Sequence, residues 1–163
     1  MPTIAFLGLG AIGAPMAQHL PAHGFDLILW NRTRERAERL AKSVRARIAD
    51  TPAEAAREAN VVITCLPTSR EVETLLDGDD GLLAGLRRGA TLVDCTSGDP
   101  ATSRRIAARL REREVAFVDA PVSGGKRGAE EGTLTIMCGG DTADVERVRP
   151  VLAAFGKLIV YCG

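Results

Sequence analysis

A glycine cluster near the amino terminus constrains the fold more than any other feature. The apolar run 3–7 is followed by Gly8-Leu9-Gly10-Ala11-Ile12-Gly13, and helix-forming residues continue over 14–23. In this spacing the first glycine allows a sharp turn after a strand, the second a close approach to a pyrophosphate, and the third tight packing of helix against strand. Amide groups at the helix start then meet the phosphate charge. The spacing predicts a dinucleotide-binding turn, and a glycine-rich turn without a ligand is the alternative.

The residues after the second expected strand, 27–30, indicate which dinucleotide is bound. Asn31, Arg32 and Thr33 come next, and Arg36 lies one helical turn further along. An NAD site usually places an acid here, about twenty residues beyond the glycines, to bind the ribose 2′-hydroxyl. Asn31 does not repel a 2′-phosphate, and Arg32 and Arg36 can pair with one. NADP(H) is therefore favoured over NAD(H), with a solvated basic helix start as the alternative.

Composition narrows the classes of function. The chain has 163 residues, 45% of them hydrophobic, and a formal net charge of zero, which predicts one domain with a substantial core. Balanced charge gives no long-range attraction to nucleic acid or to an anionic membrane, so small molecules are the expected partners. No apolar run approaches a membrane span, and the amino terminus reads as a strand rather than a signal peptide, so a cytoplasmic location is expected.

Four cysteines, at 65, 95, 138 and 162, lack C-x-x-C spacing. Each lies within or beside an apolar strand, so we expect buried small hydrophobic side chains rather than disulfides or metal ligands. No metal site is expected.

Apolar strands alternate with amphipathic helical segments along the whole chain. Strands are expected at 3–7, 27–30, 44–48, 61–66, 91–95, 115–120, 133–138 and 158–162. Helices are expected at 14–23, 53–59, 69–76, 99–113 and 141–155. Thr51 and Glu54 suggest a capping box, Pro150 a kink and Gly156 a helix stop. The pattern predicts an α/β fold with a doubly wound, mostly parallel Rossmann-like sheet, helices on both faces, and a ligand crevice at the carboxyl ends of the strands.

Polar loops follow three of these strands, at 66–69, 94–100 and 119–125. We expect all three to face one crevice, because the carboxyl ends of parallel strands share one edge of the sheet. In the third loop, the hydroxyl of Ser123 and the amides of Gly124 and Gly125 form a donor set suited to a carboxylate. A surface turn is the alternative for that loop.

With these motifs the chain resembles the β-hydroxyacid dehydrogenases, which include 3-hydroxyisobutyrate dehydrogenase, tartronate semialdehyde reductase, glyoxylate/succinic semialdehyde reductase and, more distantly, 6-phosphogluconate dehydrogenase. The resemblance rests on residues 6–17, 31–33, 65–67, 119–125 and 132–140. It implies that Ser123, Gly124 and Gly125 hold the substrate carboxylate and that Thr96 lies beside nicotinamide and substrate. It further implies that Cys65, Leu66 and Pro67 border the cofactor, and that Asn31, Arg32, Thr33 and Arg36 form the phosphate site.

The chain also departs from that family. Members carry an all-helical second domain whose first helix supplies a catalytic lysine, and Gly163 resembles the first glycine of the stretch leading into that helix. Gly98 replaces a usual isoleucine, and neither Lys126 nor Lys157 matches the catalytic position. The resemblance therefore implies a cofactor-binding domain over 1–163 with no catalytic residue of its own and little turnover.

Three functional hypotheses remain open. The chain is the NADP-binding domain of a 3-hydroxyacid dehydrogenase or semialdehyde reductase, a stand-alone regulatory nucleotide-binding module, or a subunit completed by a separate helical domain. Apolar surface around 158–161, Ile136 and Met137 is expected to be exposed without the helical domain, which favours a homo-oligomer.

Overall fold

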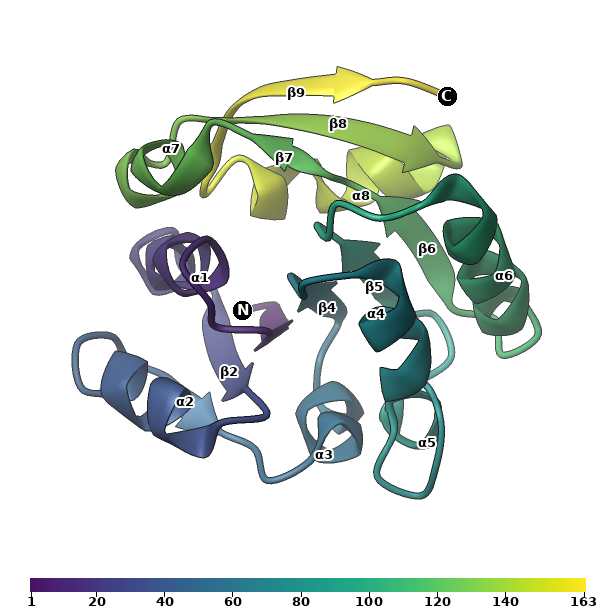
Figure 1. Cartoon of the computed structure of the whole chain (residues 1–163), viewed down its shortest axis with the longest axis horizontal. Helices are drawn as coiled ribbons and strands as arrows, with labels where there is room; N and C mark the ends of the chain where they lie inside the picture. Colours follow the sequence, from purple (N-terminus) through teal and green to yellow (C-terminus); the bar gives the residue numbers. More distant parts are fainter.

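Strands and helices alternate along the chain in the computed structural model, which describes all of residues 1–163 (Figure 1). The strands are β1 (Thr3–Leu7), β2 (Asp26–Trp30), β3 (Arg47–Ile48), β4 (Val61–Thr64), β5 (Thr91–Asp94), β6 (Ala116–Asp119), β7 (Val122–Ser123), β8 (Leu134–Gly140) and β9 (Gly156–Tyr161). The helices are α1 (Gly13–Ala22), α2 (Arg34–Ala41), α3 (Pro52–Arg57), α4 (Ser69–Leu75), α5 (Leu82–Gly85), α6 (Pro100–Arg111), α7 (Gly125–Glu131) and α8 (Thr142–Leu152).

The sheet has the order β3-β2-β1-β4-β5-β6-β8-β7, with β9 paired to β8. Every pairing from β3 across to β6 is parallel. β8 runs antiparallel to β6 and β7, and β9 runs parallel to β8. The predicted doubly wound, mostly parallel sheet is confirmed, and the order reverses between β1 and β4, where doubly wound sheets bind ligands.

Helices cover both faces because successive residues of each central strand point to opposite sides. In β1, Ile4 and Phe6 pack with apolar residues of α1, α2, α7 and α8, whereas Ala5 and Leu7 pack with those of α3 to α6. All four of these strand side chains are fully buried. The near-continuous apolar sequence of β1 is therefore what a strand covered on both faces requires.

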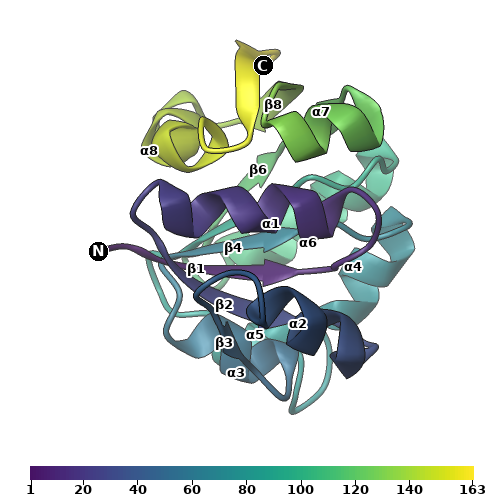
Figure 2. The ribbon, with the colours of Figure 1, turned by 90° about the vertical axis from the view of Figure 1, so that its left-hand side faces the viewer.

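The carboxyl-terminal strands form a smaller sheet that is joined narrowly to the main one. β8 pairs with β6 only at Val118–Gly140 and Asp119–Gly139, and its longer amino-terminal part pairs with β7 and β9 instead. Figure 2 shows the segment from α7 to β9 beyond α1, on the side away from α3. The main sheet and this unit are thus connected at a short joint that contains two glycines.

Several predicted boundaries were wrong. The helix expected to run to residue 155 continues through Pro150 but ends at Leu152, and Gly156 begins β9 rather than stopping a helix. A Cβ at Gly156 would lie 2.5 Å from Cδ1 of Ile136, so close packing of β9 on β8 explains this glycine. The strand expected at 44–48 is reduced to β3, and α7 was not predicted at all.

The expected capping box at Thr51 is only half formed. The Thr51 hydroxyl accepts from the N–H of Glu54 at 3.0 Å, but the Glu54 carboxylate accepts from the N–H of Asp50 rather than of Thr51. A complete capping box starts α4 instead, where Thr68 and Glu71 exchange hydrogen bonds. This helix start lies directly after the loop at the end of β4.

The cysteine side chains are all free thiols. Cys95 and Cys138 are buried and Cys65 is half-buried, but Cys162 is exposed, so the expectation of burial was wrong for that residue. Ile136 was expected at an exposed patch and is fully buried in the hydrophobic core. None of the helices combines the length and apolar character needed to cross a membrane.

Candidate functional site

The turn between β1 and α1 depends on glycine at two positions. Gly8 has φ of +102°, and a Cβ there would lie 2.1 Å from the carbonyl oxygen of Cys65. A Cβ at Gly13 would lie 2.0 Å from the carbonyl oxygen of Gly8. Gly10 is different, because a Cβ at that position would meet only Nη1 of Arg36, at 3.9 Å. Packing therefore explains Gly8 and Gly13, whereas Gly10 keeps space open at the surface of the loop.

The amide groups of residues 10–13 have no hydrogen-bond acceptor within the protein. Gly8 by contrast donates to the carbonyl oxygen of Trp30 at 3.1 Å, and Ala14 donates to that of Gly10 at 3.1 Å. The first amides of a helix carry partial positive charge and readily bind anions. The loop thus presents consecutive donors suited to a pyrophosphate.

Asn31 ties this loop to the end of β2. Its Oδ1 accepts from the N–H of Leu9 at 2.8 Å, and its Nδ2 donates to the carbonyl oxygen of Thr33 at 2.9 Å. A neutral side chain at this position therefore shapes the loop and adds no negative charge beside it.

A cavity of about 580 Å³ joins these elements. Every predicted cofactor residue except Thr96 lines it. Those residues are Gly8, Leu9, Gly10, Ala11, Ile12, Gly13, Asn31, Arg32, Thr33, Arg36, Cys65, Leu66 and Pro67. The structure thus brings three loops that are distant in sequence into one cavity at the carboxyl ends of β1, β2 and β4.

The two arginine side chains that line one end of this cavity, Arg32 and Arg36, are free to bind an anion. Arg34 pairs with Glu38 and Asp50. Arg32 and Arg36 form no ion pair, although both line the cavity. Unpaired guanidinium groups in a concave site are well suited to bind a phosphate through two parallel hydrogen bonds.

Sequence reasoning missed four residues that line the same cavity, namely Trp30, Glu71, Thr74 and Leu75. The last three share one face of α4 because they are three and four positions apart. That spacing, in a helix that begins directly after the Leu66-Pro67 loop, was the available signal. Sequence pattern alone does not place this helix relative to the glycine loop.

Thr96 lies in a buried hydrogen-bond network rather than in the cavity. Oδ1 of Asp94 accepts from the Thr64 hydroxyl at 2.9 Å and from the N–H of Thr96 at 3.0 Å. The Thr96 hydroxyl in turn accepts from the N–H of Leu66 at 3.0 Å. Thr96 is 2% exposed. The network fixes the loops after β4 and β5 relative to each other.

Ionisable groups around this network have shifted pKa values. Burial raises the pKa of Asp94, although hydrogen bonds from Thr96 and Thr64 partly oppose the shift. Burial, and secondarily the nearby Asp94 carboxylate, raise the pKa of the Cys65 thiol to about 11 and that of Asp119 to about 6. The thiol of Cys65 is therefore neutral at physiological pH, and Asp119 titrates close to that range.

The predicted carboxylate-binding residues do not line the nucleotide cavity. Ser123 ends β7, and Gly124 and Gly125, with φ of +135° and +64°, lead into α7; all three are exposed. The left-handed backbone explains both glycines. Of the three loops expected to share a crevice, the first two are joined by the Thr96–Leu66 hydrogen bond. The third begins beside the second, where the N–H of Ala120 donates to the carbonyl oxygen of Asp94 at 2.8 Å, and then leads into β7.

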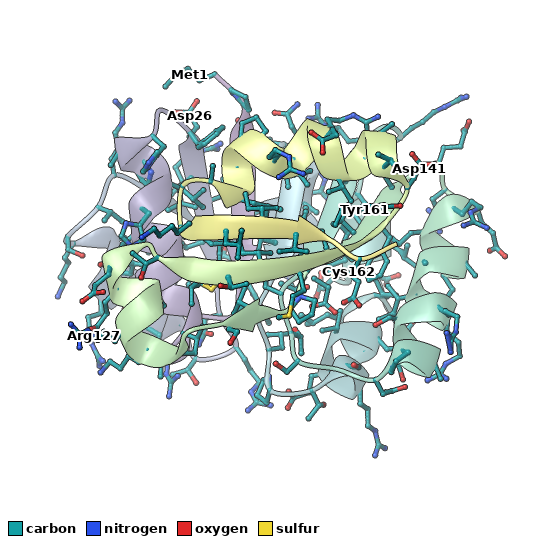
Figure 3. All side chains as sticks on the ribbon, turned by 90° about the horizontal axis from the view of Figure 1, so that it is seen from above. Met1, Asp26, Arg127, Asp141, Tyr161 and Cys162 are labelled. Atoms are coloured by element: carbon teal, nitrogen blue, oxygen red, sulfur yellow. The ribbon has the colours of Figure 1, made fainter.

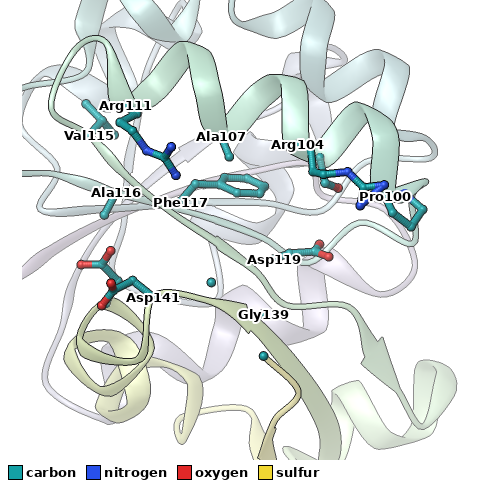
Figure 4. Close-up of a pocket in the computed structure, with 14 residues that line it drawn as sticks. Pro100, Arg104, Ala107, Arg111, Val115, Ala116, Phe117, Asp119, Gly139 and Asp141 are labelled. Atoms are coloured by element: carbon teal, nitrogen blue, oxygen red, sulfur yellow. The ribbon is translucent and has the colours of Figure 1, made fainter.

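A second cavity, of about 470 Å³, lies between α6 and the end of β8 (Figure 4). Arg104 and Arg111 of α6, Phe117 and Asp119 of β6, and Asp141, which directly precedes α8, line it. None of the predicted site residues belongs to it, but it gives solvent access to Asp119.

Comparison with known proteins relates the chain to NAD-binding domains. Residues 3–163 match the family model described as the NAD binding domain of 6-phosphogluconate dehydrogenase. The chain is 42% identical, over its whole length, to the NAD-dependent L-serine dehydrogenase of Pseudomonas aeruginosa, of which it covers 54%.

Two solved structures are similar to this chain in fold and in sequence. The 3-hydroxyisobutyrate dehydrogenase of Mycobacterium tuberculosis, solved with L-serine, has a TM-score of 0.94 and 36% identity, with 100% of this chain and 55% of that chain covered. Psf3 in complex with NADP⁺ and 2-OPP has a TM-score of 0.91 and 30% identity, with 98% and 56% covered. The chain therefore spans about half the length of these relatives, and both NAD and NADP occur among them.

Proposed function

Because the chain belongs to the family of NAD-binding domains represented by that of 6-phosphogluconate dehydrogenase, we propose that it is the NADP(H)-binding domain of a 3-hydroxyacid dehydrogenase or semialdehyde reductase. The reaction would be hydride transfer between nicotinamide and a small hydroxyacid or aldehyde that carries a carboxylate. Relatives named as L-serine and 3-hydroxyisobutyrate dehydrogenases support this substrate class.

The proposal that the cofactor is NADP(H) rests on one observation. Unpartnered amides of residues 10–13 and the unpaired guanidinium groups of Arg32 and Arg36 line the same cavity. The amides suit a pyrophosphate, and the guanidinium groups suit the 2′-phosphate that distinguishes NADP from NAD. No carboxylate occupies the position after β2 that would bind a ribose 2′-hydroxyl.

The cofactor would supply or accept the hydride, and the residues of this chain would hold the two reactants. We assign Ser123, Gly124 and Gly125 to the substrate carboxylate, and Thr96 and Leu66 to the wall beside the nicotinamide. The network through Asp94 supports the second assignment, because it holds Thr96 and Leu66 at one fixed separation.

Proton transfer to the substrate oxygen would need a positioned acid, which contributes roughly 10²–10⁴ in rate. Lys126 is exposed and lies 3.8 Å from Glu130 of its own helix, and Lys157 is exposed on β9. Neither is held toward the cavity of the glycine loop. We therefore propose that catalysis needs an acid outside residues 1–163, which the additional region of the relatives would provide.

Exposed apolar side chains on β9 support association through that strand. Leu158, Val160 and Tyr161 are 55%, 38% and 42% exposed, and no element lies over β9 in the view from above (Figure 3). We propose that the chain self-associates through this strand. Sedimentation at tens of micromolar, a range typical of transient contacts, should show a dimer or larger species; monomer alone would contradict the proposal.

The function is tested by titrating the purified chain with NADPH and NADH, followed by turnover assays. Tighter binding of NADPH than of NADH, with negligible NADP-linked oxidation of 3-hydroxyisobutyrate or reduction of glyoxylate, is the expected result. Equal affinity for the two cofactors would remove the NADP assignment. Rapid turnover would show that residues 1–163 contain a sufficient acid.

A further inference from the structure

The segment assigned to the substrate belongs to the carboxyl-terminal unit, here residues 120–163, which has few polar links to the rest of the chain. Its backbone links are the short β6–β8 pairing and the N–H of Ala120, which donates to the carbonyl oxygen of Asp94 at 2.8 Å. No ion pair joins residues 1–119 to this unit. A single side-chain hydrogen bond does so, between Nε2 of His19 and the carbonyl oxygen of Ala129, at 2.8 Å.

His19 makes this contact between the two helices that follow the two proposed ligand sites. It lies in α1, which begins at the glycine loop, and Ala129 lies in α7, which begins at Gly125. The helices are neighbours in both ribbon views (Figures 1 and 2). Because a carbonyl oxygen only accepts, Nε2 carries the proton, as it can in both the neutral and the charged imidazole.

The imidazole also lies beside the residue that ends α7. Gly132 ends that helix in the left-handed conformation, with φ of +69°, and a Cβ there would lie 3.4–3.6 Å from three atoms of the His19 ring. The ring is therefore held by the Ala129 carbonyl and lies close to Gly132. The hydrogen bond to Ala129 therefore links the position of the His19 ring to that of α7.

We propose that His19 is a positioning residue that holds the substrate segment 123–125 in place relative to the cofactor helix α1. Cofactor binding to the amides of residues 10–13 would order the start of α1, and His19 would pass that restraint to α7. The inference rests on the proposed function, because it assumes that a dinucleotide binds the glycine loop.

The test is amide hydrogen exchange of the whole chain with and without NADPH, in wild type and in two variants. His19→Ala removes the donor. His19→Gln restores it, because the glutamine Nε2 lies about as far from its Cβ as the imidazole Nε2 does. His23→Ala is the matched control, since His23 is exposed on the same helix end and only donates to the carbonyl oxygen of His19.

We expect NADPH to slow exchange over 125–131 by about fivefold in wild type, the factor for roughly 1 kcal/mol of one net hydrogen bond. His19→Gln and His23→Ala should keep this protection, and His19→Ala should lose it while residues 61–64 of β4 remain protected.

Loss in the glutamine variant as well, or full protection of α7 in the alanine variant, would overturn the proposal. Exchange at residues 10–17 tests cofactor binding separately from the role of His19. Protection there shows that cofactor binds even if α7 does not respond. Loss of protection throughout β4 in the alanine variant would show a general structural role and would also overturn it.

Discussion

The side-chain oxygen of Asn31 accepts a hydrogen bond from the backbone N–H of Leu9 at 2.8 Å. This contact connects the glycine loop after β1 with the residue that follows β2. In a dinucleotide site the first position faces the pyrophosphate and the second faces the adenine ribose. One residue therefore shapes the loop and sets the charge at the position that distinguishes NAD from NADP.

Asn31→Asp should reverse the cofactor preference. An aspartate keeps the acceptor for Leu9 but places a negative charge near the proposed 2′-phosphate. Like charges about 4 Å apart repel by roughly 1–4 kcal/mol between bulk water and the protein surface. NADPH affinity should fall accordingly, and NADH affinity should hold or improve because a carboxylate can accept from the ribose 2′-hydroxyl. Parallel fluorescence titrations with the two cofactors measure both effects, and equal losses would contradict the assignment.

Arg32→Ala should weaken NADPH binding by about 1.5–3 kcal/mol, the contribution of a hydrogen bond to a charged group. NADH binding should be nearly unchanged, since NADH lacks the 2′-phosphate. Arg39→Ala is the matched control, because Arg39 is exposed on α2 and does not line the cavity. If Arg39→Ala weakened NADPH binding as much as Arg32→Ala, a general effect of positive charge would replace the specific contact.

Alanine at Gly10 and at Gly13 should have different consequences. At Gly13 a Cβ would overlap the carbonyl oxygen of Gly8, so we expect destabilisation of about 1–3 kcal/mol or more. At Gly10 the Cβ has room in the free protein, but it would occupy the space through which a pyrophosphate approaches. Gly10→Ala should therefore retain the stability of the wild type and lose cofactor affinity. Urea unfolding and NADPH titration of the same samples separate the two effects.

Stability should fall as pH rises through the titration of Asp119. Its pKa is about 6 in the folded protein and 3.8 in the unfolded reference, so the folded state binds the proton more tightly. The resulting stability is fully present below pH of about 4 and is lost as pH rises through about 6. Asp119→Asn should flatten this part of the profile, and Asp94→Asn should lower the midpoint of Asp119 because it removes a repelling charge. Carboxyl NMR titration and urea unfolding between pH 4 and 7 measure these changes.

Local patterns were sufficient to predict the central fold and most of the nucleotide cavity. The glycine spacing placed the turn after β1, and continuous apolar runs identified strands that are buried on both faces, such as β1. Loops that follow parallel strands must meet at one edge of the sheet. Spacing and charge grouped residues 31–36 with the glycine loop, and the resemblance to the β-hydroxyacid dehydrogenases added residues 65–67.

Features that depend on tertiary contacts could not be predicted in this way. The segment 125–131 contains two glycines and no apolar periodicity, and it forms α7 against α1, where Ala129 is buried. Periodicity does not give the direction of β8, which runs antiparallel to β6. The burial of Thr96 accompanies its hydrogen bond to the side chain of Asp94, whose other partner, Thr64, comes from the neighbouring strand β4.

Calorimetric titration of the purified chain with NADPH tests the central claim most directly. We predict saturable binding of one NADPH per chain, weaker binding of NADH, and loss of the signal in Gly10→Ala. Absence of heat with both cofactors across several temperatures, or equal heat in wild type and Gly10→Ala, would show that the cavity between β1, β2 and β4 is not a dinucleotide site.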